Sequence, residues 1–367
     1  MTLRTDPVTI NFGPHHPSTH GVFQMRITAD GEVITNLEPV MGYLHRGCEK
    51  LSEGRTYTQL VPLTDRLDYL SPMSNNVACV LAAEKLGEIP VPERAQYIRV
   101  IMAELQRLAN HGAMTGFLLN DLGTFFTLFH YTMREREKIL DLFEMTCGTR
   151  VTVSYMRPGG VLQDLPEEFM PRLRALLDEL PQRLDEYEAL ITENEIVLAR
   201  TKGVGVMPRE MALAAGCSGP MLRGSGVKWD IRKNDPYGIY DRFQFDIPVG
   251  TNGDVYDRYW VRIQEMRQSV RILEQAYRDI PQGDVRTRLP LFFRLPTGEA
   301  YARIEAPKGE LGFYLVSDGG IAPYRLHVRS PSFINLGVLR DLTVGYTVAD
   351  AVITLGSVDI VLGEVDR

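Results

Sequence analysis

The chain has 367 residues, of which 44% are hydrophobic and 24% are charged. This is the composition of a globular protein with enough apolar residues for one large core or two lobes. The formal net charge is −7, from 40 Lys and Arg against 47 Asp and Glu. It argues against a nucleic-acid partner, because neutralising phosphates requires basic residues clustered on one face.

The sequence contains no run that approaches the ~18–20 apolar residues of a membrane-spanning helix. Its first residues, MTLRTDPVTINF, lack the apolar stretch of a signal peptide. We therefore expect a soluble, cytosolic chain that contacts a membrane only through partners or a surface.

The cysteines lie far apart and form no C-x-x-C pair: Cys48, Cys79, Cys147 and Cys217. In a chain without a leader, scattered cysteines are expected to be reduced and to pack in the core as small hydrophobic side chains. Their local spacing cannot hold a zinc ion or an iron–sulfur cluster.

Short β-rich runs, VTINF, VFQMRIT and EVITNL, occupy residues 8–38. The last two flank Ala29-Asp30-Gly31, and Asp-Gly is a preferred pair for a tight hairpin turn. This part of the sequence predicts a β-hairpin.

Helical periodicity follows from about residue 75 to 150, with apolar positions three and four apart through 97–119 and again through 134–148. Both helices are expected to be largely buried. An amphipathic stretch at 167–200 contains Pro181, which we expect to kink or break it. Another long helix is predicted at about 256–278, and together these segments predict a helical body.

After residue 280 the composition changes to Pro and Gly with short β-like runs at 312–318 and 324–330, before the terminal DIVLGEVDR. The predicted class is mainly α with β-rich ends. We divide it into an N-terminal β-rich region (1–74), a helical body (75–280) and a C-terminal α+β region (281–367). There is no internal repeat, so all three are expected to form one interlocked unit.

Three histidines, His15, His16 and His20, lie in the segment GPHHPSTH. Adjacent histidines on extended chain point to opposite faces, which disfavours a shared metal ion. Pro14 and Pro17 stiffen the segment, so it predicts a rigid loop that directs His20 or His16 into a cleft. The alternative, that these histidines only cap or hydrogen-bond a turn, stays open.

A second cluster of polar residues is DRLDY at 65–69. It is interleaved with leucines, so some of Asp65, Arg66, Asp68 and Tyr69 are expected to face inward. A tyrosine among buried ion pairs would have its hydroxyl held in place. A solvated charged face is the alternative.

Several long motifs carry a family resemblance: GPHHPSTHG, GYLHRGCEKLSEGRTY, DRLDYLS, RPGGVLQDLP, KGELGFYLVSDGG and DIVLGEVDR. Over nearly its whole length the chain resembles the D (49-kDa) subunits of the proton-pumping NADH-quinone oxidoreductases, respiratory complex I. That family is related to the large subunit of nickel–iron hydrogenases. The resemblance implies a hydrogenase-like helical body.

In those hydrogenases two C-x-x-C pairs hold the nickel–iron centre. On the matching pattern the early pair falls on Asp68 and Ser71 and the late pair on Val361 and Glu364. Without soft thiolate ligands such a centre cannot be assembled, so the resemblance implies a polar pocket with no redox metal. Asp359, Val361 and Glu364 would line this pocket from one side, although buried carboxylates there could equally be structural ion pairs.

The resemblance assigns this pocket to the head group of a quinone, menaquinone or ubiquinone, with His20 and Tyr69 as its hydrogen-bond partners. Reduction adds two electrons and two protons. An imidazole with a reference pKa of about 6.5 and a phenol at about 10 are suitable donors. Asp121 matches the acidic partner of the histidine, and a neighbouring carboxylate would favour its protonated form. Its alternative role is a helix cap.

Arg46 and Arg66 match arginines that face the terminal iron–sulfur cluster of a neighbouring subunit, from which the electrons would come. The implied partners are that subunit and the other peripheral-arm and membrane-arm subunits of the complex. The implied location is the cytoplasmic side of the inner membrane. Two alternatives remain: the same role in a ferredoxin- or deazaflavin-fed complex, and a non-catalytic scaffold.

Two departures from the family pattern limit this transfer. Thr152 stands where the family often has a histidine thought to tune the adjacent cluster, and a threonine cannot titrate near neutrality. We expect a cluster of lower potential and weaker pH dependence, which suits menaquinone. The stretch 282–302 is shorter than the family's usual helical insert. Two interpretations stay open: reduced contact with a neighbouring subunit, or a specialised paralogue.

Overall fold

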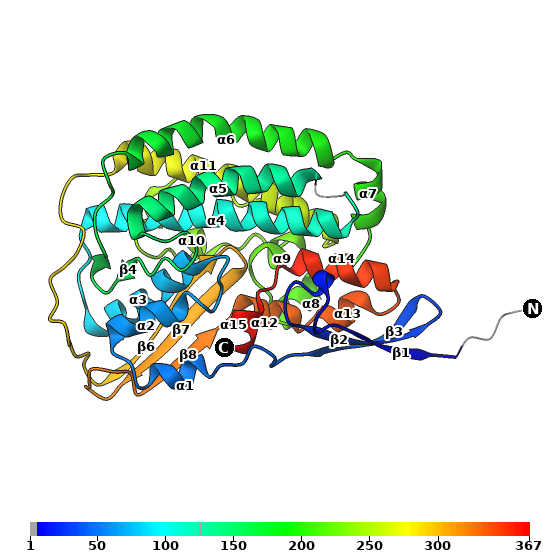
Figure 1. The fold of residues 1–367 in the computed structure, drawn as a ribbon, viewed down its shortest axis with the longest axis horizontal. Helices are drawn as coiled ribbons and strands as arrows, with labels where there is room; N and C mark the ends of the chain where they lie inside the picture. Colours follow the sequence, from blue (N-terminus) through cyan, green and yellow to red (C-terminus); the bar gives the residue numbers. More distant parts are fainter. Residues whose placement is uncertain (1–5, 125–126) are drawn as a thin grey trace, which may run out of the picture.

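A layer of long helices forms one side of the molecule (Figure 1). The computed structural model describes residues 6–124 and 127–367, and about half of the chain is helical. Four helices make the layer: α4 (Glu93–Asp121), α5 (Thr127–Cys147), α6 (Phe169–Ile191) and α11 (Val255–Asp279). The predicted helices at 97–119, 134–148 and 256–278 are confirmed.

The central helix is α4, which contacts α5, α11, α3 (Pro72–Gly87) and α14 (Val348–Val358). Almost every residue from Arg94 to Leu119 is buried, as expected of a helix that is covered on all sides. Its buried charged residues bind partners inside the protein: Arg99 donates to Glu84, and Glu104 accepts from Arg232. Its last residue, Asp121, reaches the edge of the layer, where the site described below begins.

Pro181 was expected to kink or break the amphipathic stretch, and the break does not occur, because α6 continues through it. A proline inside a helix costs ~3 kcal/mol. Leu173, Leu177, Leu180 and Leu184 are all buried on one stripe spanning the proline, and each contributes ~1.5–3 kcal/mol on burial. The chain instead leaves the helix after Ile191 and starts α7 (Glu195–Thr201), whose N-cap is Asn194.

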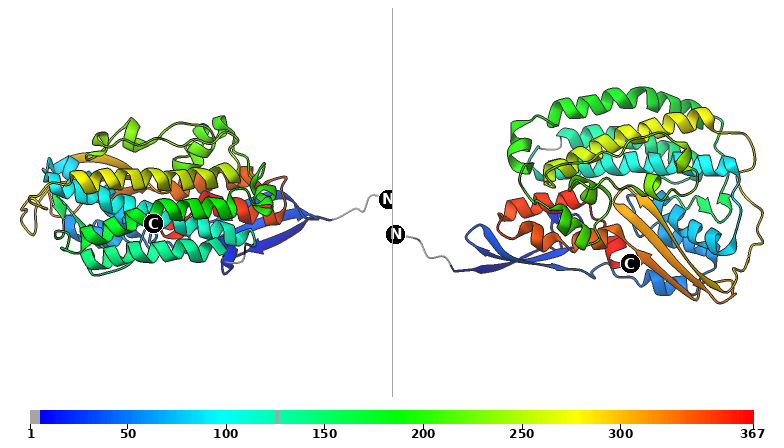
Figure 2. Two further views of the ribbon diagram at one scale, coloured as in Figure 1. Left: turned by 90° about the horizontal axis from the view of Figure 1, so that it is seen from above. Right: turned by 180° about the vertical axis from the view of Figure 1, so that it is seen from behind.

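The predicted N-terminal hairpin is confirmed as part of a three-stranded antiparallel sheet, in the order β1 (Val8–Phe12), β2 (Gln24–Asp30) and β3 (Val33–Val40). Gly31 in the β2–β3 turn has a φ of 63°, a conformation that glycine adopts without strain. Met25, Ile27 and Ile34 are buried on the inner face. The sheet extends away from the helical body in both views of Figure 2.

A second antiparallel sheet, β6 (Gly298–Ala306), β7 (Gly309–Ser317) and β8 (Arg325–Arg329), confirms the predicted strands after residue 280. It packs against α3 (Pro72–Gly87). The fold is thus a mixed α+β structure with small sheets near both ends of the chain.

Shorter elements connect these layers. They are η1 (Pro17–Thr19), α1 (Cys48–Ser52), α2 (Tyr57–Thr64), β4 (Met156–Arg157), β5 (Gly160–Val161), α8 (Arg209–Ala214), α9 (Gly219–Gly224), α10 (Ile231–Asn234), η2 (Tyr240–Arg242), α12 (Pro331–Leu336), α13 (Leu339–Thr343), α14 (Val348–Val358) and α15 (Leu362–Asp366). Among residues 6–124 and 127–367, no helix is long and apolar enough to cross a membrane. The first residues, MTLRT, lie outside the described ranges.

Two hydrophobic clusters hold the fold. The larger lies among the long helices, α3 and the C-terminal sheet, and the smaller joins the N-terminal sheet to the C-terminal helices. As a result the last residues of the chain pack beside the N-terminal loop: Asp366 accepts hydrogen bonds from the backbone N–H groups of Gly42 and Leu44. The region boundaries at residues 74 and 280 stay a prediction.

The cysteines are all free. Cys48, Cys79 and Cys217 are buried, as expected, while Cys147 at the end of α5 is only half-buried. Burial raises the pKa of the Cys79 thiol to about 12, so this side chain is an inert part of the core.

Candidate functional site

A cavity of about 740 Å³ opens where four distant segments of the chain meet. These segments are the loop before β2, the region before α3, the last turns of α4 and the residues between α14 and α15. Its lining residues are Ser18, His20, Gly21, Tyr69, Leu70, Met114, Phe117, Asn120, Asp121, Ile360 and Val361. The three residues predicted to carry the proton chemistry, His20, Tyr69 and Asp121, are among them.

His20 is held at the cavity wall by a bond to the end of α4. Its Nε2 lies 2.6 Å from Oδ2 of Asp121, and both side chains are about nine-tenths buried. Phe117 packs edge-on against the imidazole, with ring centroids 6.3 Å apart. Nδ1 of His20 makes no hydrogen bond to any residue within 6–124 or 127–367, so it is available to a ligand.

His16 and His20, the two histidines that the sequence offered for the cleft, differ in their contacts. His16 packs on Phe12, and its Nδ1 accepts a hydrogen bond from the Ser18 backbone N–H at 3.2 Å. His16 thus has the turn-stabilising role that was the alternative for this loop. His20 is the histidine that lines the cavity.

Tyr69 differs from the expectation that neighbouring ion pairs would hold its hydroxyl. The side chain is 37% exposed, and its hydroxyl forms no hydrogen bond with the part of the chain that the structure describes. Partial burial, followed by the nearby charge of Asp68, raises its pKa. The phenol therefore keeps its proton and is available to donate a hydrogen bond to a ligand.

Of the positions matched to the hydrogenase cysteines, only Val361 lines the cavity. Asp68 instead forms a buried ion pair behind the wall, with Oδ2 lying 2.9 Å from Nζ of Lys308. The hydroxyl of Ser71 donates to Ser74 at 2.9 Å at the start of α3. The expectation that Asp68 and Ser71 belong to the cavity surface is not met, because the Lys308 ammonium draws the carboxylate inward.

Lys308 is the polar residue that sequence reasoning missed. It is fully buried, its Nζ donates to Oδ1 of Asn110 at 2.5 Å, and Asp359 lies 3.5 Å away. Burial alone would lower its pKa, but Asp359 and Asp68 raise it. A lysine in the tight turn between β6 and β7 would ordinarily be taken as exposed, so no local pattern signals its burial.

Glu364 and Asp359 complete this buried group. Oε1 of Glu364 accepts a hydrogen bond from the Ser332 backbone N–H at 3.0 Å. Burial, followed by repulsion from Asp68, raises the pKa of Glu364 to about 7. Asp359 accepts from Asn110 at 3.1 Å. Asp359 has the ion-pair surroundings that were the alternative for these positions, with Arg262 at 3.6 Å and Lys308 at 3.5 Å. Glu364 is bonded to the Ser332 backbone instead.

Arg46 and Arg66 lie together at the end of α2. Nη2 of Arg46 donates to the carbonyl of Arg66 at 2.7 Å, and the Arg66 side chain is about half exposed. Asp65 behind them is fully buried, and burial raises its pKa to about 6. The two arginines thus form an exposed cationic pair. Thr152 lies in a nearby loop, where its carbonyl accepts from the Thr149 hydroxyl at 2.8 Å.

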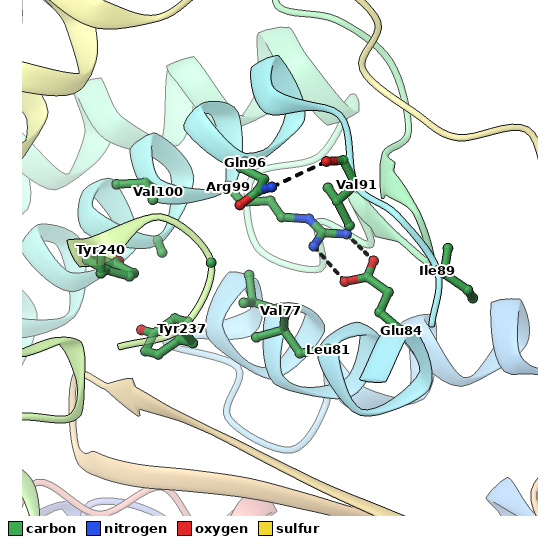
Figure 3. Close-up of a pocket in the computed structure, with 12 residues that line it drawn as sticks. Val77, Leu81, Glu84, Ile89, Val91, Gln96, Arg99, Val100, Tyr237 and Tyr240 are labelled. Atoms are coloured by element: carbon green, nitrogen blue, oxygen red, sulfur yellow. Dashed lines mark hydrogen bonds and ion pairs between the residues drawn. The ribbon is translucent and has the colours of Figure 1, made fainter. Parts of the chain in front are cut away.

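A second cavity, of about 240 Å³, lies between α3, α4 and the residues before η2 (Figure 3). Its walls are mainly apolar, and its charged groups bind each other: Arg99 donates to Glu84 through Nη1 at 2.9 Å and through Nη2 at 2.5 Å. Because this pair is satisfied internally, the larger cavity with its free imidazole nitrogen and phenol is the better candidate site.

Within residues 6–124 and 127–367, no group of three or more His, Cys, Asp or Glu side chains is placed to hold a metal ion.

Comparisons with known proteins place the chain in a family. The family model described as respiratory-chain NADH dehydrogenase, 49 Kd subunit, matches residues 121–292 and 291–367. The D subunit of NADH-quinone oxidoreductase from Dehalococcoides mccartyi is 62% identical over 367 residues, covering 100% of both chains. A D subunit from Roseiflexus sp. is 55% identical and the one from Desulforamulus reducens 53% identical, with 100% of each chain covered. The chain therefore belongs to the family of the D (49-kDa) subunits of NADH-quinone oxidoreductase, respiratory complex I.

Proposed function

We propose that the 740 Å³ cavity binds the head group of a quinone between His20 and Tyr69. The observation that carries this proposal is the convergence of Nδ1 of His20 and the Tyr69 hydroxyl on one cavity, neither of them bonded to a residue in 6–124 or 127–367. Met114, Phe117 and Ile360 provide apolar walls beside them. A flat ring with two carbonyl oxygens matches such a site, because its oxygens need donors and its ring needs apolar contact.

Two-electron reduction of a quinone requires a proton at each carbonyl oxygen. Protonated His20 donates through both ring nitrogens, so Nε2 can stay bonded to Asp121 while Nδ1 donates to one oxygen. The Tyr69 hydroxyl donates to the other oxygen as negative charge develops there. Asp121 then remains beside the imidazole, fixing its orientation throughout the transfer.

We further propose that Arg46 and Arg66 face the iron–sulfur cluster of a partner subunit, which would supply the electrons. Their exposure supports this role, since two cationic side chains at one surface favour a neighbour that gains negative charge on reduction. In the complex the chain would lie on the cytoplasmic side of the membrane as a peripheral subunit. Thr152 supports the hypothesis of a cluster with weak pH dependence and of menaquinone as substrate; a redox titration with a full pH slope would contradict it.

Replacing Tyr69 with Phe in the assembled complex tests the quinone site. The variant should lose at least about 100-fold in quinone reduction, as expected for loss of a proton donor. Electron flow from NADH to an artificial acceptor should persist. Tyr43→Phe is a matched control, because Tyr43 is also partly exposed and its hydroxyl donates to Gln24 outside the cavity. Unchanged quinone turnover in Tyr69→Phe would remove the basis for this assignment, and the scaffold alternative would then gain support.

A further inference from the structure

A groove of about 460 Å³ crosses the surface between the first turn of α2, the β4–β5 turn and the segment before β6. Among its lining residues are Thr58, Arg157, Pro158, Arg286, Arg288 and Leu291. None of them lines the proposed quinone cavity. The groove is therefore a separate feature of the surface.

Three arginines bring positive charge to the groove. Arg157, Arg286 and Arg288 form no ion pair with any residue in 6–124 or 127–367. Nη1 of Arg157 donates only to backbone carbonyls, of Ser154 at 2.6 Å and Met156 at 2.8 Å. Arg157 and Arg286 line the same groove. Burial, followed by repulsion from Arg286, lowers the pKa of Arg157, and attraction to Asp65 opposes this shift.

This positive charge stands out because the whole chain has a net charge of −7. Segment 282–294 contains Arg286, Arg288 and Arg294 against a single acidic residue, Asp284. Exposed apolar side chains accompany the arginines: Leu291 is 76% and Phe292 60% exposed. The surface thus combines cationic and apolar groups, as protein-binding surfaces do.

The groove is fixed by the fold. Thr287 donates through its backbone N–H to Gly159 at 2.8 Å and through its hydroxyl to the Pro90 carbonyl at 2.6 Å. The backbone N–H of Val161 donates to Val285 at 3.0 Å, and the side chain of Phe293 is buried. Because the arginines are presented from an anchored backbone, a ligand meets a preorganised surface.

We propose that this groove binds an acidic peptide segment of another subunit of the complex, with carboxylates on Arg157, Arg286 and Arg288 and an apolar side chain against Leu291. The parts of this chain outside the described residues, MTLRT and Phe125–Phe126, contain no Asp or Glu, so they cannot supply the carboxylates. The apolar side chains beside the arginines favour a peptide over a small inorganic anion. The proposal is independent of the quinone site.

Photo-crosslinking in the assembled complex tests the occupant. A benzophenone amino acid replaces Leu291, and the same substitution at Ile196, 63% exposed on α7, is the control. We expect position 291 to crosslink to a peptide of another subunit that carries at least two Asp or Glu residues, and position 196 not to crosslink to it. A crosslink to a peptide without acidic residues, or none in the intact complex, would overturn the proposal.

Charge reversal tests the ionic contact. The complex with the double variant Arg286→Glu/Arg288→Glu should lose the crosslinked subunit at a salt concentration that leaves the unmodified complex intact. On a native gel, at least tenfold less intact complex should remain for the variant. Arg294→Glu is the matched control, because Arg294 is exposed in the same segment but does not line the groove. Equal salt resistance of the two variants would contradict the proposal. Complexes that stay assembled should reduce quinone normally.

Discussion

His20 reaches the cavity because its loop adopts an unusual backbone conformation. Its φ is 55°, a left-handed value that costs a non-glycine residue about 1–2 kcal/mol. Two hydrogen bonds offset this cost. His20 is bonded to Asp121, and the Thr19 hydroxyl donates to the His16 carbonyl at 2.6 Å. Gly356 of α14 leaves room for the pair, since a Cβ there would lie only 3.1 Å from Oδ2 of Asp121.

Replacing Asp121 with Asn keeps the shape of the side chain and removes its charge. A hydrogen bond to a charged group contributes about 1.5–3 kcal/mol, so we expect kcat for quinone reduction to fall by about 10–100-fold. Activity with an artificial acceptor should be retained. Asp178→Asn, which removes an exposed carboxylate of α6, is the control. If both variants reduce quinone at the same rate, Asp121 has no positioning role.

Asp65 gives the fold a pH-dependent stability. Its pKa is about 6 in the folded chain, above the reference value of about 3.9, so it binds its proton more tightly when folded. The stabilisation is fully present below about pH 4 and is lost as the pH rises through about 6. Asparagine cannot ionise, so the variant Asp65→Asn does not lose this stabilisation as the pH rises. The unfolding free energy of Asp65→Asn minus that of the wild type should therefore increase by up to about 3 kcal/mol from pH 4 to pH 7. Urea unfolding at both pH values measures this difference, and a constant difference would contradict it.

At the scale of elements, a buried polar network joins α4 and α11. Glu265 of α11 lies 2.9 Å from Nε2 of His111 on α4 and accepts from Nε of Arg223 at 2.6 Å. Arg223 also donates to Glu305 of β6 at 2.7 Å. The Glu265 carboxylate therefore connects α11 with α4 and with α9, the helix that carries Arg223. Buried charges of this kind are tolerated only while each is paired.

Glu265→Gln should destabilise the chain strongly, because it leaves Arg223 buried with less compensating charge. Breaking a buried pair in this way costs about 3–5 kcal/mol. Glu274→Gln on the same helix is the control, since Glu274 is about half exposed and only weakly paired, and it should change stability by less than about 1 kcal/mol. Chemical denaturation of both variants compares them; equal midpoints would show that the buried network contributes little.

The helices and strands with clear periodicity could be predicted from the sequence. Their apolar residues recur with the repeat of the helix or strand, so that they fall on one buried face. The effect of Pro181 could not be predicted, because its local cost is outweighed by leucine burial that only the packed fold supplies. Short helices such as α8 and α9 were not predicted. Each spans only six residues, too few to show a period.

At the scale of the whole molecule, the cavity depends on the meeting of the two chain ends. His20 near the start and Val361 near the end line the same space as Asp121 from the middle of the chain. His20, Tyr69 and Asp121, which the family motifs indicated, line one cavity, and their role there stays a prediction. The motifs did not indicate that Asp68 and Glu364 lie behind it, because the position of Lys308 depends on a buried hairpin tip that no local pattern encodes.

Photoaffinity labelling of the assembled complex with an azidoquinone tests the central claim most directly. If the quinone head group binds between His20 and Tyr69, mass spectrometry should find the label on residues that line the larger cavity, in segments 18–21, 69–70, 114–121 or 360–361. An excess of unlabelled quinone should compete it away. Two results would contradict binding between His20 and Tyr69. One is competable labelling only in other parts of this chain, such as the smaller cavity of Figure 3, and the other is competable labelling only on other subunits.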